Sequence, residues 1–368
     1  MRVMIVIDQV YRAGSERNAV SLARALVHRG HQVSFNVTRD VLPVDAAMES
    51  ELYEVGIEIH RHHLEPIGRN GLRSVAGLRA EIRRFHPDVV QAFMARSHFL
   101  AAMATRGLRP RPAFVISRRA QVSDDVGGPG ERFARGTALA MADGIIANSD
   151  AVLAESVDLE RVGDRPRVVI PNMIEQRFFE QVRPAPVDTE LPVLVNVANL
   201  RHPKGQATLI RAAAVLRDQR RPVTIVLVGE GELEPQLRAL AAELAVDVRF
   251  VGPVADVRQY LARADVYVHP SDAEGMPNAI LEAAAAGCAV VATDVGGVRD
   301  AIGSVGRLVP AGRPDLLAAA VAHLLTDPER REALGRAALH RAGSYRAESY
   351  EDSFVAAHLE FYDGVRRR

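Results

Sequence analysis

The chain has 368 residues, of which 48% are hydrophobic and 25% are charged, a profile typical of a globular protein large enough for two domains. Its formal net charge is zero, which gives no indication of nucleic-acid binding or of a polybasic membrane surface. No apolar run approaches the roughly 18 residues of a membrane span. The first residues lack a secretory signal, and the lone cysteine, Cys288, lies in an apolar run where it should fill the core. The sequence therefore predicts a cytoplasmic protein.

Short apolar, β-branched runs alternate with amphipathic segments along most of the chain. This alternation indicates βαβ units and parallel sheets covered on both faces, so we expect an α/β fold of two Rossmann-like domains. Residues 180–192 contain three prolines and are the expected linker. Ligands bind beyond the carboxyl ends of parallel strands, so a cleft between the two sheets should hold the site. The predicted strands cover residues 2–8, 31–37, 88–93, 113–117, 144–149 and 167–172, and then 192–200, 222–229, 248–252, 265–271, 289–294 and 306–310.

Paired Rossmann-like domains suggest nicotinamide binding, but the glycine pattern does not support it. The first strand is followed by a single glycine, Gly14, and Gly229 and Gly231 have no third glycine at the required offset. There is also no P-loop, no HExxH and no Asp-x-Asp pair, so we expect neither a cofactor nor a metal ion. His60, His62 and His63 could suggest a metal site, but a solvated strand end is the favoured interpretation.

Two glutamates, Glu274 and Glu282, flank seven residues in the stretch "SDAEGMPNAILEAAAAG". A strand precedes this stretch, and Pro277 and Asn278 suit the first turn of a helix that ends at Gly287. The backbone amides of Gly275, Met276 and Asn278 would then point toward a ligand with the positive end of the helix dipole behind them.

Carboxylates next to an amide-lined phosphate site suit the vicinal diols of a nucleotide sugar. In this interpretation Glu282 holds the ribose hydroxyls, Glu274 holds the hydroxyls of the sugar, and the amides hold the group between them. The alternative is that Glu274 only caps the helix and that Glu282 is an exposed helix residue.

One basic residue stands apart from the rest. Of 46 lysines and arginines, all are arginine except Lys204. A compact ammonium acts as a point charge where a planar guanidinium fork does not fit, so Lys204 is a candidate phosphate ligand. Chance survival of a lysine on a loop is the alternative.

The segment "EGMPNAILEA" resembles the E-x7-E signature of retaining glycosyltransferases of family 4, which have the GT-B fold. The resemblance runs in order along nearly the whole chain. It includes "GSERNAVSLARALVHRGHQV", "ADGIIANSDAV", "VVIPNMIEQRF", "VANLRHPKGQATLIRA", "LVGEGELEPQLRALA", "VRFVGPVADV", "DVGGVRD" and the C-terminal "SYRAESYEDSFVAAHLEFYDGV".

This resemblance implies transfer of a sugar, with retention and without a metal ion, from a nucleoside-diphosphate sugar to a hydroxyl of a glycan, lipid-linked or small-molecule acceptor. A UDP-sugar is favoured and a GDP-sugar is the other candidate. The acceptor domain is expected at 1–182 with a returning helix at about 346–368, and the donor domain at 190–345. Peripheral contact with the inner face of the membrane is compatible with this activity, and the oligomeric state is open.

The resemblance also assigns residues to roles. The catalytic candidates are Lys204, on the leaving phosphates, together with Glu274 and His98. The family usually has an arginine where this chain has Asn199, and Arg201 is the nearby substitute. The remaining donor-binding candidates are Gly14, Gly229, Gly252, Val254, Gly275, Met276, Pro277, Asn278 and Glu282.

The acceptor side is less defined. Gln91 and Phe93 stand where the family often has a histidine, so His98 becomes the candidate sugar contact, with a helix-start histidine as the equal alternative. Arg118 and Arg119 end a predicted strand and could meet acceptor or phosphate. A sugar-nucleotide epimerase and a non-catalytic donor-binding subunit remain the alternative functions.

Overall fold

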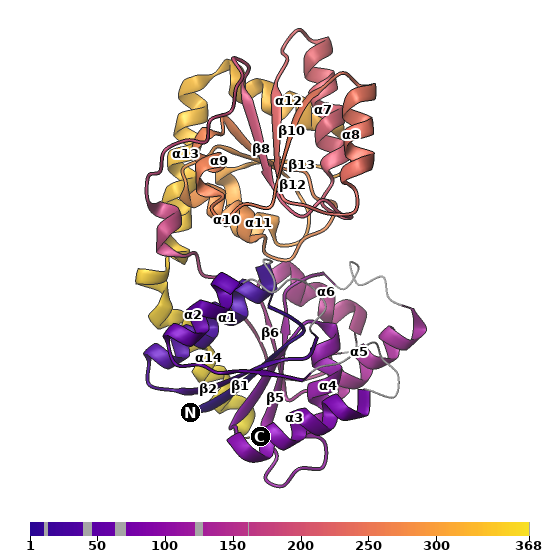
Figure 1. The fold of residues 1–368 in the computed structure, drawn as a ribbon, viewed down its shortest axis with the longest axis vertical. Coiled ribbons are helices and arrows are strands. Elements are labelled where there is room, and N and C mark those ends of the chain that lie inside the picture. Colours follow the sequence, from indigo (N-terminus) through magenta and orange to yellow (C-terminus); the bar gives the residue numbers. More distant parts are fainter. Residues whose placement is uncertain (11–13, 40–45, 63–70, 122–127, 161, 368) are drawn as a thin grey trace. The chain divides into compact units, whose positions relative to one another are not determined.

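The computed structural model describes residues 1–10, 14–39, 46–62, 71–121, 128–160 and 162–367. The chain forms two compact units, each built on its own parallel sheet (Figure 1). The first unit comprises Met1–Met173 and Glu351–Arg368, and the second comprises Ile174–Tyr350. Residues 180–192, which carry no helix or strand, belong to the second unit.

Among the described residues, the sheet of the first unit has seven strands in the order β3-β2-β1-β4-β5-β6-β7. The order reverses direction between β1 and β4, because the chain adds β2 and β3 on one side of β1 before it crosses to the other. Strand β3 is short and was not predicted as a strand of its own. The strands are β1 (Arg2–Ile7), β2 (Gln32–Val37), β3 (Ile59–Arg61), β4 (Val89–Phe93), β5 (Ala113–Arg118), β6 (Gly144–Ala147) and β7 (Arg167–Val169).

Helices cover both faces of this sheet. Apolar side chains of the three helices α3, α4 and α5 pack on one face. The C-terminal helix α14 begins in the second unit and continues in the first, where the hydroxyl of Tyr362 donates to the side-chain oxygen of Gln91 on β4. The helices are α1 (Gly14–His28), α2 (Ala46–Glu54), α3 (Gly71–Phe85), α4 (Ala95–Thr105), α5 (Pro129–Met141), α6 (Asp150–Glu160) and α14 (Ala347–Arg366).

The second unit repeats this plan. Within the described chain its sheet has six parallel strands in the order β10-β9-β8-β11-β12-β13. The strands are β8 (Val193–Val197), β9 (Thr224–Val228), β10 (Asp247–Gly252), β11 (Val266–His269), β12 (Val290–Thr293) and β13 (Arg307–Val309). The helices are α7 (Gln206–Asp218), α8 (Glu234–Glu243), α9 (Arg258–Arg263), α10 (Asn278–Ala285), α11 (Val298–Ile302), α12 (Pro314–Thr326) and α13 (Pro328–Ala342), with 3₁₀ turns η2 (Gln176–Phe179), η3 (Gly303–Val305) and η4 (Gly343–Tyr345).

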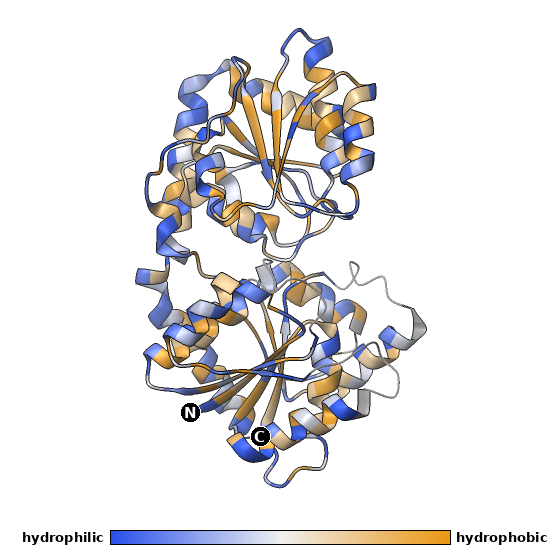
Figure 2. Ribbon diagram, viewed as in Figure 1, coloured by the Kyte–Doolittle hydropathy of each residue, from blue (hydrophilic) through white to orange (hydrophobic). Residues whose placement is uncertain are grey.

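Both sheets are apolar along their strands, and the helices expose their polar faces (Figure 2). In the second unit, α10, α11 and α13 pack on one face of the sheet, and α7, α8 and α12 pack on the other. Cys288 is buried in the first of these layers, as predicted, and burial raises the pKa of its thiol to about 12. Among the described helices, none is long and apolar enough to cross a membrane.

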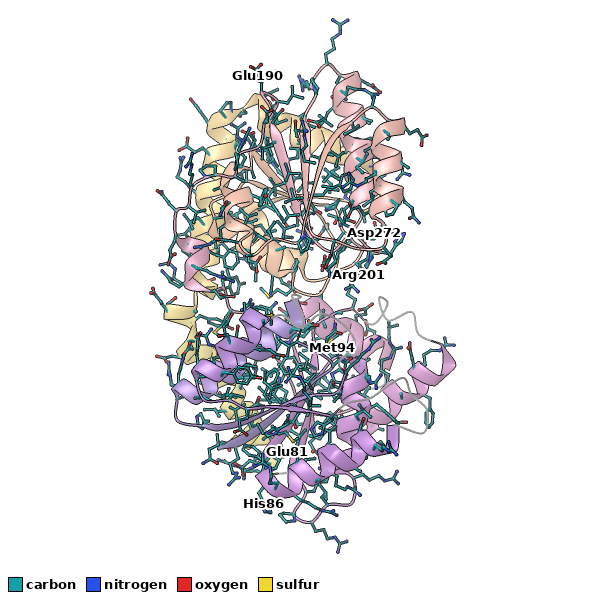
Figure 3. All side chains as sticks on the ribbon, in the orientation of Figure 1. Glu81, His86, Met94, Glu190, Arg201 and Asp272 are labelled. Atoms are coloured by element: carbon teal, nitrogen blue, oxygen red, sulfur yellow. The ribbon has the colours of Figure 1, made fainter. Side chains whose placement is uncertain are left out.

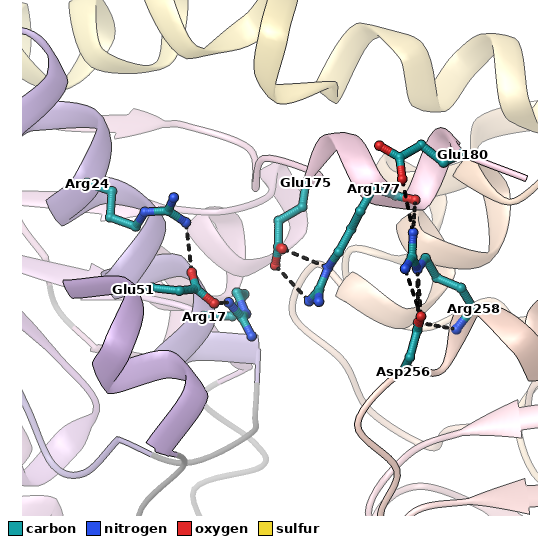
Figure 4. A network of polar contacts seen from close by, with 8 residues as sticks. All are labelled: Arg17, Arg24, Glu51, Glu175, Arg177, Glu180, Asp256 and Arg258. Atoms are coloured by element: carbon teal, nitrogen blue, oxygen red, sulfur yellow. Dashed lines mark hydrogen bonds and ion pairs between the residues drawn. The ribbon is translucent and has the colours of Figure 1, made fainter. Parts of the chain in front are cut away.

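Arginine side chains tie neighbouring elements together within each unit (Figure 4). In the first unit, Arg17 and Arg24 of α1 both donate to Glu51 of α2. In the second unit, Arg258 pairs with Asp256 at 2.8 Å and also donates to the backbone oxygen of Arg177 in η2 at 2.9 Å. Arg258 therefore anchors the segment that opens the second unit.

The strand order of the second unit brings two loops together. Strand β8 lies between β9 and β11, so the order reverses at the β8–β11 boundary, and ligands bind beyond the carboxyl ends of strands at such a point. The loop after β8 and the loop after β11 meet there, since the amide of Asp272 donates to the carbonyl of Pro203 at 2.8 Å. Gly205 permits this approach, because a Cβ at this residue would lie 2.0 Å from the carbonyl oxygen of Pro270.

We predict that Gly205→Ala destabilises the second unit more than Gly287→Ala does. Both glycines have left-handed backbone, with φ of 68° and 77°, but the space around Gly287 is open. A non-glycine residue in this conformation costs roughly 1–2 kcal/mol. The overlap at Gly205 should add about 1–3 kcal/mol, as overpacking typically does. Urea unfolding followed by circular dichroism measures the difference, and equal losses for the two variants would contradict the close approach of the loops.

Candidate functional site

The two loops at the β8–β11 boundary join Lys204 to Glu274. The ammonium nitrogen of Lys204 lies 2.7 Å from Oε1 of Glu274, and the two side chains are only 20% and 9% exposed. The same oxygen accepts hydrogen bonds from the hydroxyl of Ser271 at 2.7 Å and from Nε2 of His269 at 2.8 Å. Sequence reasoning selected Lys204 and Glu274 separately, and the structure shows them as one ion pair.

Glu274 is held as a carboxylate despite its burial. Burial by itself raises the pKa of this group, but the charge of Lys204 and the hydrogen bond from His269 outweigh it and hold the pKa below its usual range. Tyr267 behaves in the opposite way, because burial, and then the carboxylates of Glu282 and Glu274, raise the pKa of its hydroxyl. The site thus combines an ionised acceptor with a neutral hydroxyl donor.

Helix α10 begins beside this ion pair. It starts at Asn278 after the N-cap residue Pro277 and ends just before Gly287, close to the predicted bounds. Gly287 itself has a left-handed backbone. Gly275, Met276 and Pro277 are buried, so this loop is packed into the unit. Glu282 lies inside the helix and is half-buried. The two glutamates of the sequence motif thus flank the N-terminal end of the helix, where the helix dipole favours anions.

The other predicted donor residues of this unit surround the loop after β8. The carbonyl of Asn199 accepts from the side-chain amide of Gln206 at 3.0 Å, whereas Arg201 is exposed (Figure 3). Gly229 and Gly231 pack against this loop, because a Cβ there would lie 2.2 Å from the carbonyl oxygen of Ala198 and 2.3 Å from that of Leu200. These contacts account for both glycines without a ligand.

Gly252 and Val254 lie where strand β10 ends. Gly252 has φ of 78°, and its carbonyl accepts from the amide of Gly229 at 2.9 Å, which links the ends of β9 and β10. Val254 is half-buried just beyond it. Both residues are at the carboxyl end of the sheet, on the β9–β10 side of the Lys204 loop.

In the first unit, the corresponding reversal point between β1 and β4 holds a polar cluster that sequence reasoning did not select. Asp8 follows β1, and one of its oxygens accepts from the amide of Ser97 at 2.9 Å and from the Ser97 hydroxyl. Burial raises the pKa of Asp8. The position of an acid directly after an apolar strand could have identified Asp8 from the sequence.

The predicted donor residue Gly14 is the first residue of α1. Residues 11–13, which precede it, lie outside the described residues.

The predicted acceptor residue His98 is in the interior of the first unit. His98 is only 2% exposed. Burial, and to a lesser extent the charge of Arg118, lowers the pKa of its imidazole to about 3. Nε2 of the ring lies 3.2 Å from the carbonyl oxygen of Ser117. A buried neutral ring gives no support to direct contact with a sugar, which remains a prediction. Arg118 is also buried, and Arg119 donates to Asn172 at 2.9 Å.

The histidines near β3 make ordinary polar contacts. Nε2 of His62 lies 2.8 Å from the side-chain oxygen of Asn36, and His60 lies 3.5 Å from Glu81. His63 lies outside the described residues. Among the residues that the structure describes, no cluster of three or more histidines, cysteines or acids could hold a metal ion.

Comparison with known proteins decides the family. One family model, described as Glycosyltransferase Family 4, matches residues 12–177, and another, described as Glycosyl transferases group 1, matches residues 191–327. The chain belongs to glycosyltransferase family 4. The structure of Anabaena Alr3699/HepE in complex with UDP and glucose covers 99% of this chain and 100% of its own, with a TM-score of 0.81 at 22% identity. The fold of this family 4 chain is GT-B.

Two curated relatives are named for phosphatidylinositol monomannoside mannosylation and for lipopolysaccharide core biosynthesis. A GDP-mannose-dependent monoacylated alpha-(1-6)-phosphatidylinositol monomannoside mannosyltransferase of Corynebacterium glutamicum is 33% identical over 40% of this chain, which spans 41% of that protein. The lipopolysaccharide core biosynthesis glycosyltransferase LpsE of Rhizobium meliloti is 29% identical over 87% of this chain and 88% of its own length.

We predict that the stability contributed by Glu274 depends on pH. Its pKa is lower in the folded state, so its contribution is fully present above the unfolded value of about 4.3 and is lost as the pH falls below it. The difference in unfolding free energy between wild type and Glu274→Gln should therefore shrink between pH 7 and pH 3.5 in urea unfolding experiments.

Glu332→Gln is the matched control for this experiment. Glu332 is 73% exposed beside Arg336 on α13, so its removal should change the unfolding free energy by less than about 1 kcal/mol at either pH. A pH-independent difference for Glu274→Gln would contradict the depressed pKa.

Proposed function

We propose that this chain is a retaining glycosyltransferase that moves a sugar from a nucleoside-diphosphate sugar to an acceptor hydroxyl. The observation that carries the proposal is the ion pair of Lys204 and Glu274 at the reversal point of the sheet, beside the N-terminus of α10. A cation, a carboxylate and a helix N-terminus at one sheet edge supply what a sugar diphosphate requires. The cation and the helix dipole favour the phosphates, and the carboxylate accepts from sugar hydroxyls.

Each group then has a chemical role. Lys204 and the amides of the loop before α10 stabilise the diphosphate as negative charge develops on it, since preorganised donors are usually the largest catalytic contribution. Glu274 accepts hydrogen bonds from the transferred sugar, and Glu282 accepts them from the ribose. Gly252 and Val254, at the end of β10, contact the nucleobase through their backbone. Arg201 is exposed and is available as a second cation for the diphosphate.

The proposed reaction proceeds on one face of the sugar. The bond between the anomeric carbon and the phosphate oxygen breaks, and the acceptor oxygen forms its bond on the same face, which retains configuration. The departing phosphate oxygen takes the proton of the acceptor hydroxyl, so no protein nucleophile is assigned.

The donor is proposed to be a UDP-sugar, with a GDP-sugar as the second candidate. The structurally similar HepE was solved in complex with UDP and glucose, whereas the name of the Corynebacterium relative specifies GDP-mannose. Both donors share the diphosphate that Lys204 would contact, and they differ only at the base and the sugar.

We also propose that the acceptor is presented at an anionic membrane surface. Exposed arginines of the first unit include Arg73 and Arg83 on α3, Arg132 on α5, and Arg106 directly after α4. Phe133, beside Arg132 on α5, is 73% exposed. An exposed aromatic ring next to an exposed arginine suits the boundary between headgroups and lipid chains. The names of two relatives, which include a phosphatidylinositol monomannoside and lipopolysaccharide core biosynthesis, agree with such an acceptor.

The transferase activity is tested by incubating the purified chain with UDP- or GDP-sugars and separating the products. Release of nucleoside diphosphate, together with a glycosylated acceptor of retained configuration, is the expected result. Release of an isomerised free sugar nucleotide would identify an epimerase. Donor binding without turnover would identify a non-catalytic subunit, and either outcome overturns the proposal.

We predict that Lys204→Ala lowers kcat about 10²-fold or more, because loss of one preorganised donor typically costs roughly 3–4 kcal/mol. Lys204→Arg should recover little of this loss, since a planar fork does not reproduce a compact charge. Glu282→Ala should instead raise the donor KM, because the ribose does not change during the reaction. Donor-saturation kinetics on the three variants separate these effects. Normal activity of Lys204→Arg would remove the argument from the lone lysine.

We predict that replacing Arg132 by Glu and Phe133 by Ser weakens binding to vesicles that contain phosphatidylglycerol by at least about 10-fold. Each arginine near an anionic surface contributes about 1 kcal/mol, and charge reversal removes more than that. The matched control replaces Arg330 by Glu and Leu339 by Ser. Both residues are exposed on α13 in the structure. Vesicle sedimentation is the measurement. If the two double variants sediment with the vesicles to the same extent, the surface around Arg132 and Phe133 is not the membrane contact.

A further inference from the structure

A buried series of hydrogen bonds leads from strand β11 to the carboxylate of Glu274. We propose that His269 and Ser271 are positioning residues that hold the Glu274 carboxylate in one orientation while Lys204 binds the leaving diphosphate. This inference rests on the proposed function, because it assigns the diphosphate to Lys204 and the sugar to Glu274.

The geometry at Glu274 creates the need for such residues. Three donors meet at Oε1, from Lys204 at 2.7 Å, Ser271 at 2.7 Å and His269 at 2.8 Å. Of these three donors, only the ammonium of Lys204 carries a fixed charge. A bound diphosphate would therefore compete with Glu274 for this ammonium. Without its cation, a carboxylate that is 9% exposed would be left without the charge that pairs with it. The hydrogen bonds from His269 and Ser271 stay in place and keep the carboxylate hydrogen-bonded.

The contacts of His269 specify which nitrogen carries the proton. Glu274 is a carboxylate and can only accept, so Nε2 of His269 must donate to it. A neutral ring that is protonated at Nε2 has an acceptor at Nδ1, and the hydroxyl of Tyr267 lies 3.2 Å from Nδ1 and can donate to it. Tyr267 and His269 are two residues apart on β11 and therefore lie on the same face of the strand. Tyr267 thus fixes the tautomer that Glu274 requires.

The backbone around this series is also fixed. The hydroxyl of Thr293, at the end of β12, donates to the carbonyl of His269 at 3.3 Å and to the carbonyl of Ser271. Tyr267, His269 and Ser271 are each no more than 2% exposed. The series is therefore anchored at two strand ends, and it has no solvent-exposed member before it reaches Glu274.

If His269 positions Glu274, its loss should affect the rate of sugar transfer and not the binding of the donor. The ribose and base contacts assigned to Glu282 and β10 do not involve His269. A small displacement of the Glu274 carboxylate affects the transferred sugar in the transition state, where a misplacement of about 1 Å can cost about 10²-fold in rate. Loss of His269 should therefore appear in kcat and leave the donor KM nearly unchanged.

The test compares His269→Leu with His269→Gln. The leucine variant removes the donor, and kcat should fall about 10-fold or more, whereas the donor KM should change less than about 3-fold. The glutamine variant places an N–H₂ near the position of Nε2 and should recover most of kcat. His340→Leu, an exposed histidine on α13, is the matched control and should have wild-type kinetics. Tyr267→Phe, which keeps the ring and removes the hydroxyl, should lower kcat by an intermediate factor.

A second measurement does not depend on turnover. Long-range ¹H–¹⁵N spectra of the wild-type protein, with the His269 signals assigned by their loss in His269→Gln, report which ring nitrogen carries the proton. An Nε2-protonated ring is the expected result, and an Nδ1-protonated ring overturns the inference even if His269→Leu does not fold.

The kinetic outcomes separate this inference from the proposed function. An active wild-type enzyme whose His269→Leu variant keeps its kcat, or whose loss appears only in donor KM, overturns the positioning role and leaves the transferase assignment intact. Equal kcat for the leucine and glutamine variants overturns it as well. A wild-type chain that transfers no sugar overturns the proposed function.

Discussion

The ion pair between Lys204 and Glu274 is the interaction on which the candidate site depends. It exists because two loops from neighbouring strands touch at their backbones, and they touch because Gly205 has no side chain to separate them. Burial of a carboxylate is costly unless it is paired and hydrogen-bonded, and Glu274 has three donors on one oxygen. The backbone approach thus comes first, and the charge arrangement follows from it.

The loop after β8 shows the same dependence on backbone contact. Gly229 and Gly231 both lie against its carbonyl groups, so any side chain at either position would displace the loop that carries Lys204. These contacts hold the backbone of Lys204 in one place. Three glycines that leave no space for a Cβ are one way to obtain a rigid loop without large side chains near the ligand.

Most of the fold could be predicted because parallel strands buried on both faces are continuous apolar runs, and twelve predicted runs overlap the observed strands β1, β2 and β4 to β13. Strand β3 differs because its three residues, Ile59–Arg61, are half-buried and two of them are polar. The start and the end of α10 could also be predicted, since proline and glycine restrict the backbone locally. These successes all depend on signals carried by neighbouring residues.

The site was only partly predictable, because its decisive contacts are not local in sequence. A glycine needed for approach to a ligand has the same appearance in a sequence as one needed for approach to another loop, and Gly229 makes a contact of the second kind. His98 looked like an accessible residue at a helix start, but its place on the inner face of α4 buries it. His269 was overlooked because a histidine within an apolar strand gives no indication of its partner.

The electrostatics of the site also constrain the order of events in the proposed reaction. If Lys204 binds the diphosphate as proposed, its ammonium is shared between Glu274 and the phosphates, and donor binding would weaken the ion pair seen here. The carboxylate then has to draw on neutral donors, and sugar hydroxyls are donors of that kind. In the proposed reaction, each sugar hydroxyl that reaches Glu274 would replace part of the lost interaction with Lys204. Occupation of the sugar position would then be coupled to release of the lysine. A nucleoside diphosphate without the sugar lacks these hydroxyls. It would weaken the ion pair by binding Lys204 and would supply no new hydrogen bond to Glu274. The ion pair would therefore favour the intact donor over its hydrolysis product.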